Sequence, residues 1–278
     1  MSSRLREIAR ENALIVAAGG YRTRSGRQVS LAAGLAEAKA GTRIYGPNPV
    51  IPDEESVRGS RRTVFEVTGE SSTVAARRLA GEPALGPVAV LNFASARNPG
   101  GGYVRGAKAQ EEALCRASAL YETLLEAPEY YEVHRAGRST FYTDRVIHSP
   151  GVPVFRDDRG ELLETPFRAG FLTSPAPNAG TIRRQEPERA REIPAALTRR
   201  AGRVLEVAAL HGYGALVLGA WGCGVFRNDP AQVAEAFRSH LTTRFTGTFS
   251  HVTFAVLDRD PAPREAFTRA FAGAFAGA

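Results

Sequence analysis

Two adjacent glutamates follow a run of three glycines at a spacing that could build an acid/base site. The glycines, residues 100–102, come directly after an apolar, strand-like segment, residues 88–94, and Glu111 and Glu112 stand at the start of a helical pattern. Consecutive glycines allow the backbone to adopt positive φ values and to come very close to a ligand. A carboxylate pair at a helix start, beside such a loop, predicts proton transfer to a ligand that backbone N–H groups hold.

Each part of this pattern also has an ordinary structural explanation. A glycine run can form a flexible surface turn, and acidic side chains in a first helical turn are stabilised by the helix dipole. The order of the features, GGG-x7-QEE with the triplet beginning at Gln110, favours the functional interpretation.

A second glycine-rich segment, residues 219–230, reads Gly-Ala-Trp-Gly-Cys-Gly-Val-Phe-Arg-Asn-Asp-Pro. It follows an apolar segment and precedes a helical pattern, whose start is marked by Asn228 or Asp229 as the cap and by Pro230. In open α/β sheets, phosphates bind in loops that run from the carboxyl end of a strand into a helix. The segment lacks the third glycine of a dinucleotide-binding fingerprint and the Gly-Lys-Ser/Thr of a P-loop.

A tight turn would explain only part of this second loop. Gly222 and Gly224 suit such a turn, but Trp221, Val225 and Phe226 are then left as exposed apolar side chains without a role. Because both glycine-rich loops follow core strands, we expect them at the same edge of one sheet.

Strand-like and helical segments alternate along the chain, which predicts an α/β fold with three layers, a sheet between helices. The expected strands are residues 63–67, 88–94, 145–149, 152–156, 170–176, 215–221 and 251–258. The expected helices are residues 4–18, 31–40, 72–79, 109–125, 193–211, 230–245 and 263–275. We expect residues 1–60 to form an N-terminal helical extension packed on the core, and residues 61–278 to form the catalytic domain.

Two connecting segments are predicted to have no regular structure. Pro47, Pro49 and Pro52 predict an extended connector, and the polar stretch of residues 178–191 predicts an exposed loop.

The composition is that of a globular protein, with 43% hydrophobic and 23% charged residues in a chain of 278. No stretch approaches the roughly 20 apolar residues of a membrane span, and the first residues contain no apolar signal core. Two cysteines, Cys115 and Cys223, are too few for a disulfide framework, and the five histidines show no zinc-ligand spacing. We therefore expect a cytoplasmic protein without a metal.

The formal charge of +7 and the pI of about 9.8 favour attraction to polyanions. Nearly all of the basic residues are arginines, Lys39 and Lys108 being the exceptions, and they form no basic run. The charge therefore permits a polyanionic partner but does not identify one.

Three segments together resemble the bacterial-type poly(ADP-ribose) glycohydrolases: residues 92–102, 106–116 and 220–230. The resemblance covers roughly residues 60–260, and the N-terminal helices are similar in character to those of the bacterial subgroup. It implies a macrodomain fold with a mixed sheet between helices. It also implies a glycosidase that hydrolyses the ribose–ribose O-glycosidic bonds of poly(ADP-ribose), releases ADP-ribose and needs no cofactor.

The resemblance implies a role for each matching residue. Glu112 corresponds to the catalytic glutamate, and Glu111 to the partner that holds the ribose next to the scissile bond. The implied substrate-binding residues are Asn98, Gly100, Gly101, Gly102 and Gln110 around that ribose, Gly222, Cys223, Gly224, Val225 and Phe226 at the diphosphate and distal ribose, and Glu70 at the adenine.

The chemistry requires Glu112 to carry a proton for the leaving oxygen and then to activate water. A helix N-terminus favours its ionised form, whereas Glu111 and the substrate's diphosphate favour its protonated form. We therefore expect protonation to be coupled to polymer binding.

The implied partners are poly(ADP-ribose), ADP-ribose and ADP-ribosylated proteins, with no membrane, no direct nucleic-acid binding and a monomeric state. Three alternatives stay open: a macrodomain that binds ADP-ribose without cleaving it, a hydrolase of mono-ADP-ribose on protein side chains or nucleic-acid ends, and a basic nucleic-acid-binding protein.

Overall fold

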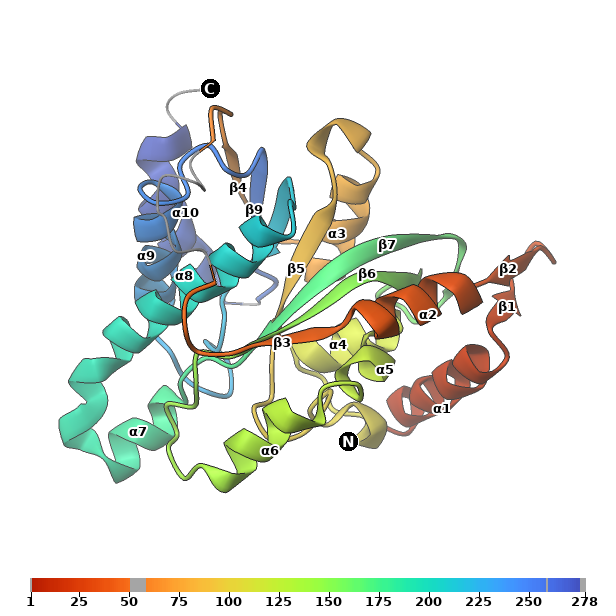
Figure 1. The fold of residues 1–278 in the computed structure, drawn as a ribbon, viewed down its shortest axis with the longest axis horizontal. Coiled ribbons are helices and arrows are strands. Elements are labelled where there is room, and N and C mark those ends of the chain that lie inside the picture. Colours follow the sequence, from red (N-terminus) through yellow and green to blue (C-terminus); the bar gives the residue numbers. More distant parts are fainter. Residues whose placement is uncertain (1, 51–58, 259, 276–278) are drawn as a thin grey trace.

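A seven-stranded mixed sheet with helices on both faces forms the centre of the molecule (Figure 1). The computed structural model describes residues 2–50, 59–258 and 260–275. The strand order is β3-β6-β7-β5-β8-β9-β4. The strands are β3 (Arg43–Tyr45), β4 (Val64–Thr68), β5 (Val88–Phe93), β6 (Val146–Arg156), β7 (Leu162–Ser174), β8 (Ala215–Leu218) and β9 (His251–Ala255). The predicted three-layer α/β class is confirmed.

Each face of the sheet has its own hydrophobic core. One core is covered by α8 (Ile193–Leu210), α9 (Pro230–Leu241) and α10 (Ala262–Phe275). The helices over the other core are α1 (Ser3–Ala17), α2 (Ala32–Gly41), α3 (Ser72–Ala80), α4 (Gln110–Ala117), α5 (Leu120–Leu124) and α6 (Pro128–Ala136). Strands such as β8 are buried along their whole length, which explains why they read as continuous apolar runs.

One edge of the sheet collects the loops that matter for function. β4, β9, β8, β5 and β7 run parallel to one another, so their carboxyl ends meet at this edge. β6 is antiparallel to β7 and begins where β7 ends. The two glycine-rich loops, which follow β5 and β8, therefore lie side by side, as expected.

The N-terminal segment contributes to the sheet as well as covering it. Between α1 and α2 lies a two-stranded hairpin, β1 (Gly20–Arg22) and β2 (Gln28–Ser30), and β3 pairs antiparallel with β6. The division of the chain at residue 60 stays a prediction. Of the predicted proline connector, Pro52 lies outside the described residues.

Several predicted elements were wrong in their extent, because contacts between distant segments override local periodicity. The helix predicted over residues 109–125 is interrupted at Ser118, which is extended and bridges to Val154 of β6. Residues 145–149 and 152–156 are one strand with a bulge, where Gly151 has a φ of 53°. The loop predicted over residues 178–191 contains α7 (Ala179–Gln185) and a 3₁₀ helix, Pro187–Glu192.

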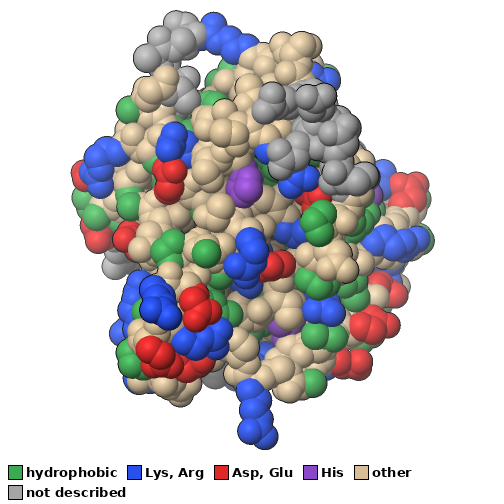
Figure 2. Space-filling view, turned by 60° about the vertical axis from the view of Figure 1, so that its left-hand side comes forward, with side chains coloured by type: hydrophobic (Ala, Val, Ile, Leu, Met, Phe, Trp, Pro, Cys, Tyr) green, Lys and Arg blue, Asp and Glu red, His purple; other side chains and the backbone are tan. Residues whose placement is uncertain are grey.

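Charge is mixed on the side of the molecule that carries α7, α8 and α9. Figure 2 shows Lys and Arg side chains interspersed there with Asp and Glu side chains. Ion pairs explain part of this arrangement, as between Arg189 and both Glu186 and Glu192. The net positive charge is therefore not gathered into one basic surface on this face. Among the described residues, no helix is long and apolar enough to cross a membrane.

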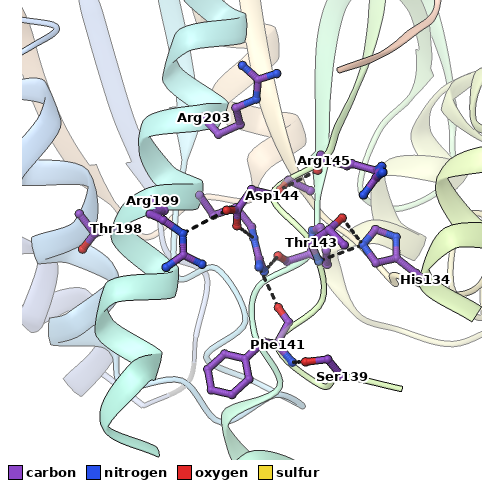
Figure 3. A network of polar contacts seen from close by, with 12 residues as sticks. His134, Ser139, Phe141, Thr143, Asp144, Arg145, Thr198, Arg199 and Arg203 are labelled. Carbon is purple, nitrogen blue, oxygen red and sulfur yellow. Dashed lines mark hydrogen bonds and ion pairs between the residues drawn. The ribbon is translucent and has the colours of Figure 1, made fainter. Parts of the chain in front are cut away.

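A buried arginine fixes the segment before β6 to the segment after β7. Arg200 of α8 is 1% exposed and donates to Asp144 Oδ1 (3.0 Å), Pro175 O (2.6 Å) and Phe141 O (2.8 Å). Its neighbour Arg199 pairs with the same carboxylate at 3.2 Å from an exposed position (Figure 3). A guanidinium can serve three acceptors at once because its donors form a rigid planar fork.

Replacing these two arginines separately should give very different losses of stability. Arg200→Met leaves a carboxylate and two carbonyls without their buried partner, so it should lower the free energy of unfolding by about 3–5 kcal/mol. Arg199→Met removes only an exposed pair and should cost about 0–1 kcal/mol. Urea unfolding of both variants measures the difference. Equal losses would show that burial of Arg200 is not what stabilises this corner.

Candidate active site

The glutamate pair is positioned by the residue before it. Gln110 is the first residue of α4, and its side-chain carbonyl accepts from the Phe93 N–H (2.9 Å). Its amide nitrogen donates to Leu91 O (2.8 Å) and to Ser72 Oγ (3.1 Å). Gln110, predicted to bind substrate, thus holds the start of α4 against β5 and the start of α3.

Glu111 is a buried carboxyl with both oxygens engaged. It is 3% exposed, Oε1 accepts from Asn92 Nδ2 (3.2 Å) and Oε2 accepts from the Ser95 N–H (2.7 Å). Burial, helped by the charge of Glu112, raises the pKa of Glu111 to about 8 against the lowering effect of these two hydrogen bonds. At neutral pH the Glu111 carboxyl is therefore mainly protonated.

Glu112 has one oxygen fixed and one oxygen free. Oε1 accepts from the Gly102 N–H at 2.8 Å. Oε2 is buried and, among the residues that the structure describes, finds no hydrogen-bond partner. A buried polar atom without a partner costs free energy, so its retention points to a ligand or a reaction.

The first glycine loop passes directly over the pair. Gly100 and Gly101 have φ values of 62° and 59°. A Cβ on Gly101 would lie 2.6 Å from Glu112 Oε1 and 2.9 Å from Glu111 Oε2, so no side chain fits between the two carboxylates. The exposed Asn98 starts this turn, and its carbonyl accepts from the Gly101 N–H at 3.0 Å.

The second glycine loop connects β8 to α9. Gly222 has a φ of 70°, and a Cβ there would lie 2.5 Å from Ala176 Cβ and 2.6 Å from Asn228 Nδ2. Asn228 is buried and donates to Pro177 O and Gly222 O, which closes the loop. The helix cap is Asp229, whose side chain accepts from the Ala231 N–H.

This loop presents unused backbone donors. Within the described part of the chain, the N–H groups of Gly222, Gly224, Val225 and Phe226 have no acceptor, whereas the Cys223 N–H donates to Ala220 O. Successive free N–H groups at a strand-to-helix turn form an anion-binding concavity. The loop is therefore suited to bind a diphosphate.

The side chains of the second loop differ from one another in exposure. Trp221, predicted to be exposed, is 1% exposed; its indole donates to Ser174 O at 3.0 Å and pins the loop to the end of β7. Val225 is 83% exposed. Phe226 is half-buried, and its ring packs on that of Tyr142 with the centroids 5.9 Å apart.

Glu70 lies just after β4, at the same edge of the sheet, and pairs with Arg78 at 2.6 Å. Its predicted contact with adenine stays a prediction. No group of three or more His, Cys, Asp or Glu residues in the described ranges could hold a metal ion.

Two residues of this site were missed in the sequence. Asn92 is fully buried near the end of an otherwise apolar strand, and that lone polar residue was a usable signal. Tyr142 has a φ of 58°, unusual for a bulky side chain, and nothing in its local sequence marks it.

Comparison with known proteins identifies the family. The family model described as microbial-type PARG, catalytic domain, matches residues 9–157. This chain belongs to the microbial-type poly(ADP-ribose) glycohydrolase (PARG) family. The resemblance carried by the three motifs is thus confirmed. No curated protein sequence gave a match.

Solved PARG structures match along almost their whole length. PARG from Thermomonospora curvata is 48% identical, with a TM-score of 0.89 over 97% of this chain and 100% of that one. The same protein bound to the inhibitor ADP-HPD is 48% identical, with a TM-score of 0.88 over 96% of this chain and 99% of that one. PARG from Deinococcus radiodurans in complex with ADP-ribose is 48% identical, with a TM-score of 0.80 over 86% of this chain and 98% of that one.

The raised pKa of Glu111 predicts how stability depends on pH. The folded protein keeps this proton up to about pH 8, whereas the unfolded chain releases it near the ordinary value of 4.5. The contribution of Glu111 to the free energy of unfolding should therefore fall between these two values and be constant outside them. Glu111→Gln cannot titrate, so its melting temperature should rise relative to wild type across this window. The control Glu129→Gln, at an exposed position of α6, should show no such trend. A constant difference for Glu111→Gln would contradict the assignment.

Proposed function

We propose that this protein hydrolyses the ribose–ribose O-glycosidic bonds of poly(ADP-ribose) and releases ADP-ribose, with Glu112 as general acid and base. The observation that carries the proposal is the unpartnered, buried Oε2 of Glu112, whose neighbour Glu111 is also buried and over which the Gly101 backbone passes. The identity to PARG proteins solved with ADP-ribose and with ADP-HPD supports the substrate.

In the proposed first step, Glu112 Oε2 gives its proton to the oxygen that leaves the anomeric carbon of the terminal ribose. The bond between that carbon and the leaving oxygen breaks, and an oxocarbenium-like centre develops. The ionised Glu112 then takes a proton from water as the water oxygen bonds to the anomeric carbon. The products are ADP-ribose and a shortened polymer.

The N–H of Gly102 has a defined part in this scheme. It holds Oε1 of Glu112 at 2.8 Å, so the other oxygen keeps one orientation through both proton transfers. The neutral Glu111 beside it limits the negative charge that faces the incoming diphosphate.

The rest of the ligand follows the carboxyl edge of the sheet. The four free N–H groups of the loop after β8 suit the diphosphate. Phe226, half-buried against Tyr142, suits a ribose face, and Glu70 after β4 suits the adenine end. A macrodomain that only binds ADP-ribose would have no use for a buried carboxylate oxygen at the scissile bond, which favours the hydrolase over a reader.

We place this reaction in the reversal of ADP-ribosylation, including that which accompanies DNA damage, in the cytoplasm. The partners are ADP-ribosylated proteins that carry the polymer, and the enzyme acts as a monomer without a cofactor.

Glu112→Gln should abolish cleavage while leaving ADP-ribose binding largely intact. The amide can still accept from the Gly102 N–H but cannot supply a proton, and loss of a positioned acid costs about 10²–10⁴-fold in rate. Release of ADP-ribose from polymer and calorimetric binding of ADP-ribose are the two measurements. Glu129→Gln is the control and should match wild type. More than about a tenth of wild-type activity in Glu112→Gln would exclude this residue as the acid.

Phe226→Ala and Phe237→Ala should separate turnover from stability. Phe226 is half-buried beside the site, so its loss should misplace the ribose and reduce the rate roughly 10²-fold with little change in melting temperature. Phe237 of α9 is fully buried against Trp221, so its loss should lower the free energy of unfolding by about 3–5 kcal/mol. Melting temperature and cleavage rate are compared on the same preparations. A large loss of stability in Phe226→Ala, with the folded fraction fully active, would make Phe226 a core residue.

A further inference from the structure

The order of the strands predicts where the rest of the polymer must go. If the proposed function holds, adenine, diphosphate and terminal ribose lie in turn over the carboxyl ends of β4, β8 and β5. The scissile bond is at the far end of that ribose, so the leaving part of the polymer continues towards the next strands, β7 and β6. The segment that leads into β6, residues 139–145, lies at this end of the row.

Residues 139–145 are held firmly in place. Arg200 binds the carbonyl of Phe141 and the carboxylate of Asp144. The backbone N–H and hydroxyl of Thr143 contact Nε2 of His134 at 3.2 and 2.8 Å (Figure 3). The backbone that carries Arg145 is therefore fixed before a ligand binds, which reduces the entropy lost on binding.

Three arginines from separate segments lie around the His134 ring and the start of the first glycine loop. Arg97 directly precedes Asn98 of the first glycine loop, and Arg135 of α6 donates to its carbonyl at 3.0 Å. Arg145 ends the fixed segment, and in Figure 3 its side chain extends to the same side as the His134 ring. Burial, together with the charges of Arg200, Arg145 and Arg97, lowers the pKa of His134 to about 4. Arg97 and Arg145 therefore both lie within electrostatic reach of the His134 ring.

The charges of this arginine cluster, Arg97, Arg135 and Arg145, are not compensated by nearby acids. In the described residues, no carboxylate comes within ion-pair distance of any of the three guanidinium groups. Asp144, which directly precedes Arg145 in the chain, is already paired with Arg199 and Arg200. Arg97 and Arg135 are exposed and Arg145 is half-buried, so all three can reach a ligand at the surface.

We propose that this arginine cluster is a subsite for the diphosphate of the ADP-ribose unit on the leaving side of the scissile bond. The proposal rests on the proposed function, since it is that reaction which places a second diphosphate here. Guanidinium groups bind phosphate oxygens through paired, charge-assisted hydrogen bonds. The subsite would favour a polymer over a single ADP-ribose, because only a polymer occupies both diphosphate sites.

The test is the double variant Arg97→Ala/Arg145→Ala, compared with the control Arg24→Ala/Arg62→Ala. The control loses the same charge at two exposed positions, in the β1–β2 turn and before the amino end of β4, both away from the site. The cluster variant should raise the KM for poly(ADP-ribose) about tenfold, equivalent to about 1.4 kcal/mol, and make KM less dependent on salt. Its Kd for ADP-ribose and its melting temperature should match those of the control.

Three results would overturn the proposal. The KM for polymer could equal that of the control, or the affinity for ADP-ribose could fall as much as that for polymer, which would assign the arginines to the terminal unit. Equal loss of binding to single-stranded DNA of similar length would make the cluster a general polyanion site. If the wild-type protein releases no ADP-ribose from the polymer, the proposed function is rejected. Polymer binding by the arginine variants in the Glu112→Gln background still tests the cluster in that case.

Discussion

The removal of two neighbouring carboxyl groups from water is the constraint on which the rest of the site depends. Glu111 is almost completely buried, and its raised pKa records the cost of ionising it there. The protein meets this cost with donors from β5 and the loop after it, Asn92 and Ser95. The arrangement leaves Glu112 with one fixed and one free oxygen, so a single carboxylate oxygen is available to a ligand.

The glycine loop is a consequence of the same constraint. Its backbone must come within van der Waals distance of both carboxylates, and positive φ values at Gly100 and Gly101 allow it to do so. Any side chain at residue 101 would occupy the space between the two glutamates. The absence of a Cβ is therefore a requirement of packing against the carboxylates as well as of backbone conformation.

The parallel strands bring this pair together with the other parts of the site. β4, β8 and β5 end at one edge of the sheet. Glu70, the anion-binding loop after β8 and the Glu111–Glu112 pair therefore lie in a row, although they are far apart in the chain. The antiparallel β6 adds the segment that begins at its own amino end, and the buried Arg200 holds that segment to the end of β7. The row of segments at this edge therefore continues past the carboxylate pair instead of ending at it.

The sequence by itself determined the alternation of strands and helices, the two glycine-rich loops and the carboxylate pair. These features depend on local properties: the conformational freedom of glycine, the apolar character of buried strands and the spacing of apolar residues in helices. Their order in the chain also identified the family, which the comparisons confirmed. The roles of the individual site residues stay predictions.

Only the tertiary structure decided which groups in these segments are free and which are engaged. Gln110 is predicted to bind substrate, and the structure adds that its amide contacts β5 and Ser72. Trp221 looked exposed, but a carbonyl at the end of β7 accepts from its indole. The break in the predicted helix at Ser118 likewise comes from pairing with β6. Burial, hydrogen-bond satisfaction and pKa depend on residues that are distant in the sequence, and local patterns contain no information about those contacts.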